Sequence, residues 1–143
     1  MSKKILFLTG TRADFGKIKS LIQILEAYPE FEPFIFVTGM HLQKEYGFTL
    51  LEVERCGFSN IHTFENHTHE TTMDLTLAKT IKGLSAYVKQ CEPDMIVIHG
   101  DRVEALAGAI VGSLNNILVA HIEGGEVSGT IDELIRHSTS KMS

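Results

Sequence analysis

Short, continuously apolar runs alternate with amphipathic helical patterns along this chain, and this alternation constrains the fold more than any other feature. The runs are rich in Val, Ile and Phe and do not alternate with polar residues, as in strands that are buried on both faces. Strands that are separated by helices form a parallel sheet with right-handed crossovers. We therefore predict an α/β fold, a Rossmann-like doubly wound parallel sheet, with strands at residues 5–8, 34–37, 61–64, 95–98 and 117–122.

Three longer segments between these strands repeat apolar residues at helical spacing. Residues 39–60 are less regular, and we expect short helices there at residues 42–46 and 50–55. A last helix is expected to begin at Ile131, because residues 130–133 form a capping-box pattern. The predicted apolar helix faces are Ile18, Leu21, Ile22, Leu25 and Tyr28; Leu77, Ile81, Leu84, Val88 and Cys91; and Val103, Leu106, Ala107, Ile110 and Leu114.

Composition narrows the class of protein. The chain has 143 residues, 43% hydrophobic and 22% charged, which is ordinary for one globular domain. A formal net charge of −5 argues against a nucleic-acid backbone as the main partner. Two cysteines are too few for a disulfide scaffold, and no segment approaches the ~20 apolar residues of a membrane span. We expect a cytoplasmic protein that binds neither nucleic acid nor a membrane.

Polar side chains follow four of the five expected strands, in residues 10–12, 65–70, 99–102 and 121–126. Residues 38–41, after the second strand, give a weaker signal. In an open parallel sheet, ligands bind beyond the carboxyl ends of the strands. These side chains are therefore expected to share one edge of the sheet and to form the functional site.

The turn after the first strand, residues 10–17, is a candidate anion site. A glycine lets the backbone approach a ligand, and the following helix N-terminus favours negative charge. The turn is not a P-loop, since its glycine spacing is one residue too long and Ile18 stands where Ser or Thr would hold magnesium. Arg12 and Lys17 are predicted to bind a phosphate or a sugar. The alternative is an ordinary turn in which Asp14 is the N-cap.

Carboxylates after the fourth and fifth strands are candidate acid/base groups. Asp101 has two interpretations. It is either an acid/base group or a helix cap, because residues 101–104 also form a capping signature in which the Asp101 carboxylate would accept hydrogen bonds from the backbone amides of the next helix. Glu123 precedes two glycines, so no helix begins there and a structural role explains it poorly. Asp132 is either a site residue or a favourable charge in a first helical turn.

Two histidine–carboxylate pairs raise the question of a metal. His99 and Asp101 are two residues apart, as are His121 and Glu123, so an extended backbone would point each pair one way. Imidazole with carboxylate suits zinc or iron, but this spacing is not diagnostic, and we expect no catalytic metal. The histidines within residues 67–69 are expected to be solvated.

Four motifs together resemble those of the hydrolysing UDP-N-acetylglucosamine 2-epimerases of sialic-acid and related nonulosonate synthesis. They read GTRADFGK at 10–17, HGDRVEAL at 99–106, HIEGGEVSGT at 121–130 and DELIRH at 132–137. The run from residue 121 to 137 carries most of the specificity. The non-hydrolysing relatives typically have Pro-Glu after Gly-Thr-Arg, Glu-Ala-Gly-Leu-Arg in place of Glu-Gly-Gly-Glu-Val, and Glu-Glu at 132–133.

This resemblance implies two Rossmann-like domains of GT-B type (UDP-glycosyltransferase/glycogen phosphorylase-like) with the active site in the cleft between them. Residues 1–143 are then the N-terminal domain of a longer protein, and the second, UDP-binding domain lies outside this chain. By itself the chain is expected to be inactive, whereas the full-length protein is expected to be a homo-oligomer.

The resemblance also implies a reaction without a cofactor. UDP leaves C1 of a UDP-2-acetamido sugar while C2 loses its proton, and water then adds to the resulting glycal. The products are UDP and a free N-acetylmannosamine-type sugar. By motif position the catalytic carboxylates are Asp101, Glu123 and Asp132. The substrate-binding residues are Arg12, Lys17 and Arg136.

Two other functions remain open on the sequence. A glycosyltransferase with the same two-domain architecture is compatible with the fold, as is a non-catalytic nucleotide-sugar-binding module. Release of a free epimerised sugar separates the epimerase from the transferase, and turnover separates both from the binding module. The substrate's C4 and C6 groups, and therefore the choice between N-acetylglucosamine and a 2,4-diacetamido-trideoxy sugar, cannot be read from these residues.

Overall fold

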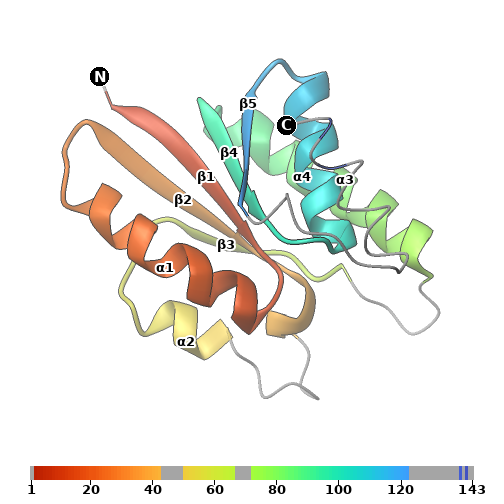
Figure 1. Ribbon diagram of the computed structural model, residues 1–143, viewed down its shortest axis with the longest axis horizontal. Coiled ribbons are helices and arrows are strands. Elements are labelled where there is room, and N and C mark those ends of the chain that lie inside the picture. The colour runs from red at the N-terminus through yellow and green to blue at the C-terminus, as the bar shows by residue number, and fades with distance from the viewer. Residues whose placement is uncertain (1, 43–49, 67–71, 123–138, 140, 142–143) are drawn as a thin grey trace.

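A computed structural model describes residues 2–42, 50–66, 72–122, 139 and 141 of the chain. Within these residues the centre is a parallel sheet in the order β3-β2-β1-β4-β5 (Figure 1). All five predicted strands are confirmed, and so is their parallel pairing. The strands are β1 (Lys3–Thr9), β2 (Phe31–Val37), β3 (Ile61–Thr63), β4 (Met95–His99) and β5 (Leu118–Ile122).

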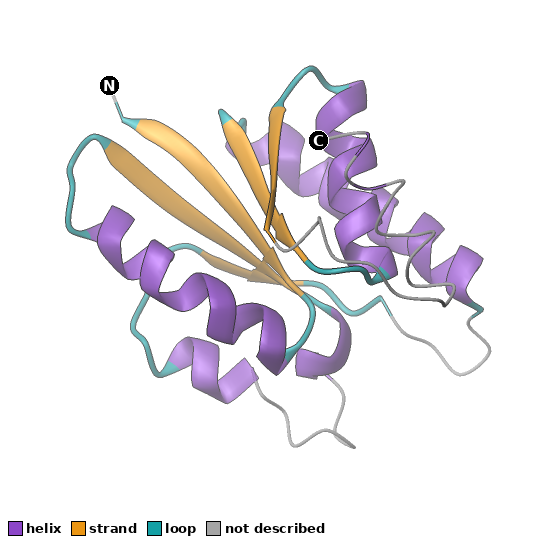
Figure 2. Ribbon diagram, viewed as in Figure 1, coloured by secondary structure: helices purple, strands orange, loops and turns teal. Residues whose placement is uncertain are grey.

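Helices cover both faces of the sheet, as a doubly wound fold requires (Figure 2). The helices α1 (Arg12–Glu26) and α2 (Leu50–Glu54) pack on one face, whereas α3 (Met73–Cys91) and α4 (Val103–Leu114) pack on the other. Successive side chains of β1 serve the two faces alternately. Ile5 and Phe7 join the α1 side of the core, and Leu6 and Leu8 join the α3 side. The predicted Rossmann-like class is confirmed.

Two of the predicted helix faces are partly wrong. Tyr28 lies beyond the end of α1, and Leu21 is 37% exposed and not part of the buried face. In α4 the buried face consists mainly of small residues, and Leu114 is 80% exposed. The small face brings α4 close to the sheet, where a Cβ on Gly108 would lie 2.5 Å from Ile98. The spacing of large apolar residues did not predict this face, because the close approach of the α4 backbone to the sheet leaves room only for small residues.

The segment between β2 and β3 matches the prediction in part. A short 3-10 helix, η1 (Gly39–Leu42), follows β2 directly, and α2 is present nearly as predicted. The helix expected at residues 42–46 lies mostly outside the described residues. None of the helices that the structure describes is long and apolar enough to cross a membrane.

The strand order creates a switch point between β1 and β4. From β1 the chain passes outward to β2 and β3, and α3 then returns it to the other side of β1, where β4 and β5 follow (Figure 1). Loops from neighbouring strands diverge at such a point and leave a crevice at the carboxyl edge. The ends of β1 and β4 are therefore where the fold favours a ligand.

The rings of His62, Tyr87 and Phe36 stack against one another at the β3 side of the sheet, away from this switch point. The His62 ring lies 4.3 Å from the Tyr87 ring and 5.6 Å from that of Phe36, centroid to centroid. Burial lowers the pKa of His62. Burial, with a smaller contribution from Cys91, raises the pKa of Tyr87 to about 12. Both groups are therefore held in their neutral forms near pH 7.

Candidate functional site

The turn between β1 and α1 is built around the carboxylate of Asp14. Its Oδ2 accepts hydrogen bonds from the backbone amides of Gly10 and Thr11, each at 3.0 Å. The Thr11 hydroxyl in turn accepts from the Asp14 amide at 3.1 Å, which completes a capping box. The interpretation of Asp14 as the N-cap is therefore wrong, because Thr11 occupies that position and Asp14 lies three residues into the helix.

The second oxygen of Asp14 joins this turn to β4. Its Oδ1 lies 2.7 Å from Nδ1 of His99, and the two side chains are 12% and 9% exposed. The bond places the Nδ1 proton toward the carboxylate and fixes the orientation of the imidazole ring. It spans the switch point between β1 and β4, so the first and second motifs meet there. No local sequence pattern predicts this Asp14–His99 pair, since the two residues are 85 positions apart.

The loop after β4 meets the end of β5. Nε2 of His121 lies 2.7 Å from the carbonyl oxygen of Gly100, and the Gly100 amide donates to the carbonyl of Ile122 at 3.1 Å. Both histidines of the metal hypothesis therefore direct a ring nitrogen at a protein oxygen. No cluster of three or more His, Cys, Asp or Glu side chains suited to a metal ion occurs in the part of the chain that the structure describes.

Asp101 does not cap α4. The N-cap of this helix is Arg102, without a side-chain cap, so the capping alternative is wrong. Asp101 is half-buried and makes no hydrogen bond or ion pair with another described residue. A carboxylate at the carboxyl edge, beside the switch point and without a structural partner among these residues, suits a site role.

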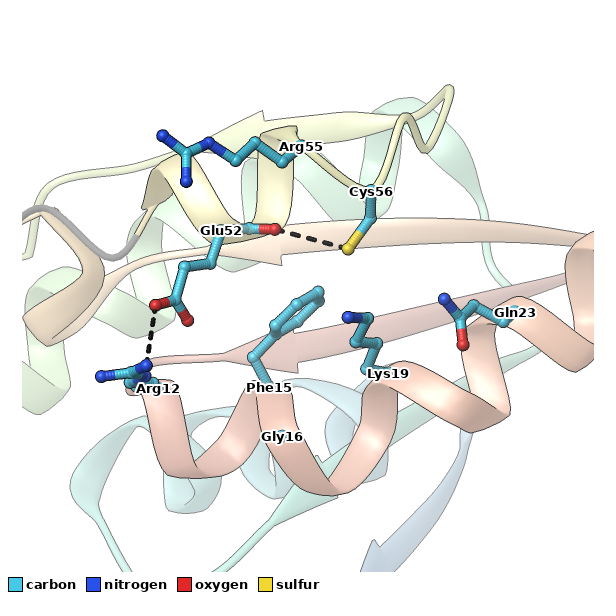
Figure 3. A pocket seen from close by; sticks show the side chains of 8 residues that line it. All are labelled: Arg12, Phe15, Gly16, Lys19, Gln23, Glu52, Arg55 and Cys56. Atoms are coloured by element: carbon cyan, nitrogen blue, oxygen red, sulfur yellow. Dashed lines mark hydrogen bonds and ion pairs between the residues drawn. The ribbon is translucent and has the colours of Figure 1, made fainter.

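Arg12 lines an open pocket of about 620 Å³ between α1 and α2 (Figure 3). Its guanidinium forms an ion pair with Glu52 at 3.1 Å, between side chains that are 73% and 40% exposed. Lys17 is exposed and does not line this pocket, because five residues correspond to about 140° around the helix. The pocket lining is Arg12, Phe15, Gly16, Lys19, Gln23, Glu52, Arg55 and Cys56.

Two buried residues of this edge escaped the sequence analysis. Asn66 is fully buried and donates to the Glu104 carboxylate at 2.8 Å. In the sequence, Asn66 was one polar residue of the segment after β3, and Glu104 was only the partner of a capping signature. The signal in the sequence that points to Glu104 is its place one turn after Asp101, within the second motif.

Three predicted site residues, Glu123, Asp132 and Arg136, lie outside the described residues. The helix expected from Ile131 and the pair of histidines at residues 67–69 also fall there. Of the six predicted site residues, the structure thus describes Arg12, Lys17 and Asp101, and it places Arg12 and Asp101 after the two strands that flank the switch point.

Known proteins resemble this chain over nearly its whole length. It is 52% identical over 141 residues to a UDP-N-acetylglucosamine 2-epimerase of Neisseria meningitidis serogroup B, a match that covers 99% of this chain and 37% of the relative. It is 37% identical over 148 residues to a UDP-N,N'-diacetylbacillosamine 2-epimerase (hydrolyzing) of Legionella pneumophila, covering 100% of this chain and 39% of the relative. The chain thus spans less than half the length of these relatives.

A solved structure agrees with the sequence matches. The Methanocaldococcus jannaschii UDP-GlcNAc 2-epimerase, in complex with UDP-GlcNAc and UDP, superposes with a TM-score of 0.82 at 26% identity, over 98% of this chain and 38% of that one. The family model described as UDP-N-acetylglucosamine 2-epimerase matches residues 23–143. With the fold, the motifs and this match in agreement, the chain belongs to the UDP-N-acetylglucosamine 2-epimerase family.

Proposed function

We propose that this chain is the N-terminal domain, residues 1–143, of a two-domain hydrolysing UDP-N-acetylglucosamine 2-epimerase. The share of each relative that it spans, 37% and 39%, supports a second domain. The Legionella pneumophila relative is named as hydrolyzing, and the Methanocaldococcus jannaschii enzyme holds UDP-GlcNAc and UDP. The motif run at residues 121–137 favours the hydrolysing type, because the non-hydrolysing relatives differ there.

One observation carries the proposal: hydrogen bonds bring three of the family motifs together at the switch point. Asp14 to His99 joins the motif at 10–17 to that at 99–106. His121 to Gly100 joins the latter to the motif at 121–130. Motifs that are far apart in the chain therefore converge where an open α/β sheet binds its ligand.

The reaction needs groups that move protons at C2 of the sugar. One carboxylate removes the C2 proton while the C1–O bond breaks and its electron pair leaves with UDP, which gives a 2-acetamidoglycal. Water then adds, with a proton delivered to C2 and the hydroxyl to C1. We assign this acid/base work to Asp101, Glu123 and Asp132, the carboxylates at the family's motif positions, because a positioned carboxylate can accept a proton and deliver one.

The cations hold the substrate in this scheme. Arg12 and Lys17 on α1, with Arg136, bind the diphosphate and the sugar. Arg12 is already paired with Glu52, so a bound diphosphate either shares this guanidinium or displaces the carboxylate. The exposed Arg12–Glu52 ion pair contributes little to stability, so a diphosphate can replace Glu52 as the partner of Arg12 at a small cost in free energy.

The test is to supply the full-length protein with UDP-N-acetylglucosamine, or with its 2,4-diacetamido-trideoxy relative, in D₂O. We expect UDP and a free 2-epimeric sugar that carries deuterium at C2, identified by NMR. A product still linked to UDP would indicate a non-hydrolysing epimerase. Sugar transfer that depends on an acceptor would indicate a glycosyltransferase, and a free sugar without deuterium at C2 would rule out elimination and re-addition.

A further inference from the structure

A buried hydrogen-bond network centred on Asn66 connects four elements at the carboxyl edge. The Asn66 side-chain nitrogen donates to Oε2 of Glu104 and to the hydroxyl of Thr80, each at 2.8 Å. Its oxygen accepts from the amide of Gly39 at 3.0 Å. Asn66 is 0% exposed and Glu104 is 5% exposed. The end of β3 is thereby tied to the start of η1, to α3 and to the first turn of α4.

The Glu104 side chain packs against the backbone turns that follow β1 and β2. A Cβ built on Gly10 would lie 3.3 Å from Cγ of Glu104. A Cβ built on Gly39 would lie 3.2 Å from Oε2 of Glu104 and only 2.7 Å from the carbonyl oxygen of Gly10. The two glycine turns and this carboxylate therefore pack so closely that they leave little room for a Cβ at either glycine, and we expect displacement of Glu104 to let Gly10 and Gly39 move.

Helix stability alone does not explain a buried carboxylate at this place. An acidic side chain in a first helical turn is favourable through the helix dipole, but an exposed one has the same effect. Asp74 illustrates this in the first turn of α3, where it is exposed. Burying a carboxylate is costly unless it is well bonded, and apolar packing is often as stable. The burial of Glu104 and Asn66 therefore favours a role in holding a specific geometry.

The Gly10 turn is held from its other side by the site residues already described. Asp14 binds the amides of Gly10 and Thr11 and also holds His99. Arg12 begins α1 directly after this turn. The position of Gly10 therefore determines where Arg12 and the imidazole of His99 stand relative to a ligand.

We propose that Asn66 and Glu104 are positioning residues of the substrate site, which hold the Gly10 and Gly39 turns in the arrangement that receives the diphosphate-sugar. They act through the two turns and touch no reacting atom. This inference rests on the proposed function. Misplacement of bound groups by about 1 Å lowers rates by roughly 10²-fold, so a loss of this network should reduce turnover without unfolding the protein.

The principal test uses a double-mutant cycle in the full-length protein, with Asn66→Ala, Glu104→Ala and the double variant. Steady-state rates with UDP-N-acetylglucosamine are measured at a temperature where circular dichroism shows each variant folded. We expect each single change to lower kcat/KM about 10-fold or more, and the double change to add little, because the pair acts as a unit. Folded single variants with the wild-type kcat/KM, or fully additive losses, would overturn the inference.

Two further variants separate positioning from general destabilisation. Glu104→Gln keeps an oxygen that accepts from Asn66, and it should recover most of the loss seen in Glu104→Ala. The matched control is Asp74→Asn, which removes an exposed carboxylate from the same position of another helix and should leave kcat/KM unchanged. A loss in Asp74→Asn as large as that in Glu104→Ala would indicate a helix effect and contradict the proposal.

A second measurement does not depend on catalysis. The Gly39 amide donates to the Asn66 side chain, so Asn66→Ala should accelerate hydrogen exchange at Gly39 about 10-fold or more in the ligand-free full-length protein. If the wild-type protein turns over no UDP-sugar, the proposed function fails, whereas this experiment still tests the network. Unchanged exchange at Gly39 would overturn the network itself.

A milder substitution tests the same network if the alanine variants do not fold. Thr80→Val keeps the side-chain shape and removes one acceptor of Asn66, together with the hydrogen bond that the Thr80 hydroxyl donates within α3 to the Thr76 carbonyl at 2.7 Å. We expect faster exchange at Gly39 and a kcat/KM that is lower by about 3-fold, since one of three bonds to Asn66 is lost. Wild-type values for both quantities would refute the proposal.

Discussion

Replacement of Gly39 by Ala tests the close approach of the β1 and β2 turns. Gly39 has a φ of +64° and Gly57 a φ of +73°, so alanine is strained at both positions. At Gly39 the new Cβ would also lie 2.7 Å from the carbonyl oxygen of Gly10, whereas at Gly57 nothing lies within 4 Å. Gly57→Ala is therefore a matched control that carries the backbone strain without the steric contact.

The structure gives a magnitude for each change. A left-handed alanine costs about 1–2 kcal/mol, and the smaller entropy of the unfolded chain offsets roughly 0.4–1 kcal/mol, so Gly57→Ala should lose about 1 kcal/mol. At Gly39 the Cβ needs some 0.7 Å more room, the difference between 2.7 Å and an ordinary 3.4 Å contact. Overpacking of this kind adds about 1–3 kcal/mol, for a total of about 2–4 kcal/mol.

Urea unfolding followed by circular dichroism measures both losses, with the free energy of unfolding taken from variants that share one m-value. Gly16→Ala serves as the opposite control, because Gly16 lies inside α1 with nothing within 4 Å, and alanine should stabilise it by about 0.5–1 kcal/mol. Equal losses for Gly39→Ala and Gly57→Ala, to within about 0.5 kcal/mol, would refute the close approach.

Three further predictions concern pH, the carboxylates and metal. Burial lowers the pKa of His62, so the unfolded chain binds this proton more readily. Its contribution to stability is present above pH 6.5 and is lost as the pH falls below it; His62→Phe should flatten the dependence of Tm on pH between 5 and 8. In the full-length protein, Asp101→Asn and Glu123→Gln should each reduce kcat by roughly 10²-fold or more. Asp101→Ala should barely change the free energy of unfolding, because Arg102 is the N-cap of α4. A loss of about 1 kcal/mol, the usual cost of a lost N-cap, would contradict this. Prolonged chelation should leave turnover nearly unchanged, and a loss that zinc or manganese restores would revive the paired-histidine hypothesis.

The strands and most of the helices were predictable because their signal is local. The three inner strands β1, β2 and β4 are mainly buried apolar runs, and α3 shows its buried face in Leu84, Val88 and Cys91. The gathering of the motif residues at the carboxyl edge, where the proposed site lies, was predictable too, since a parallel sheet brings the strand ends together. The face of α4 was not, because its contact with the sheet selects small residues such as Gly108, which carry no periodic hydrophobic signal.

Residue roles were harder to predict wherever one short pattern permits two structures. Residues 101–104 match a capping signature, yet the helix begins at Val103 and Glu104 turns into the interior instead. Asp14 matches an N-cap, yet Thr11 takes that position. In both motifs a carboxylate meets a distant partner that the local pattern did not indicate: Glu104 accepts from Asn66, and Asp14 binds His99.

The sequence by itself determined the α/β class, the parallel strands, the sheet edge at which we propose the site, and the family resemblance. These depend on hydrophobic period and on motifs read within a few residues. Only the tertiary structure decided that Asp14 holds His99 and that Asn66 meets Glu104. Those partners are 85 and 38 residues apart, and they meet because the sheet order places β1 beside β4 and because α4 packs close to the strand ends. Contacts of this kind follow from the packing of whole elements, which no local period encodes.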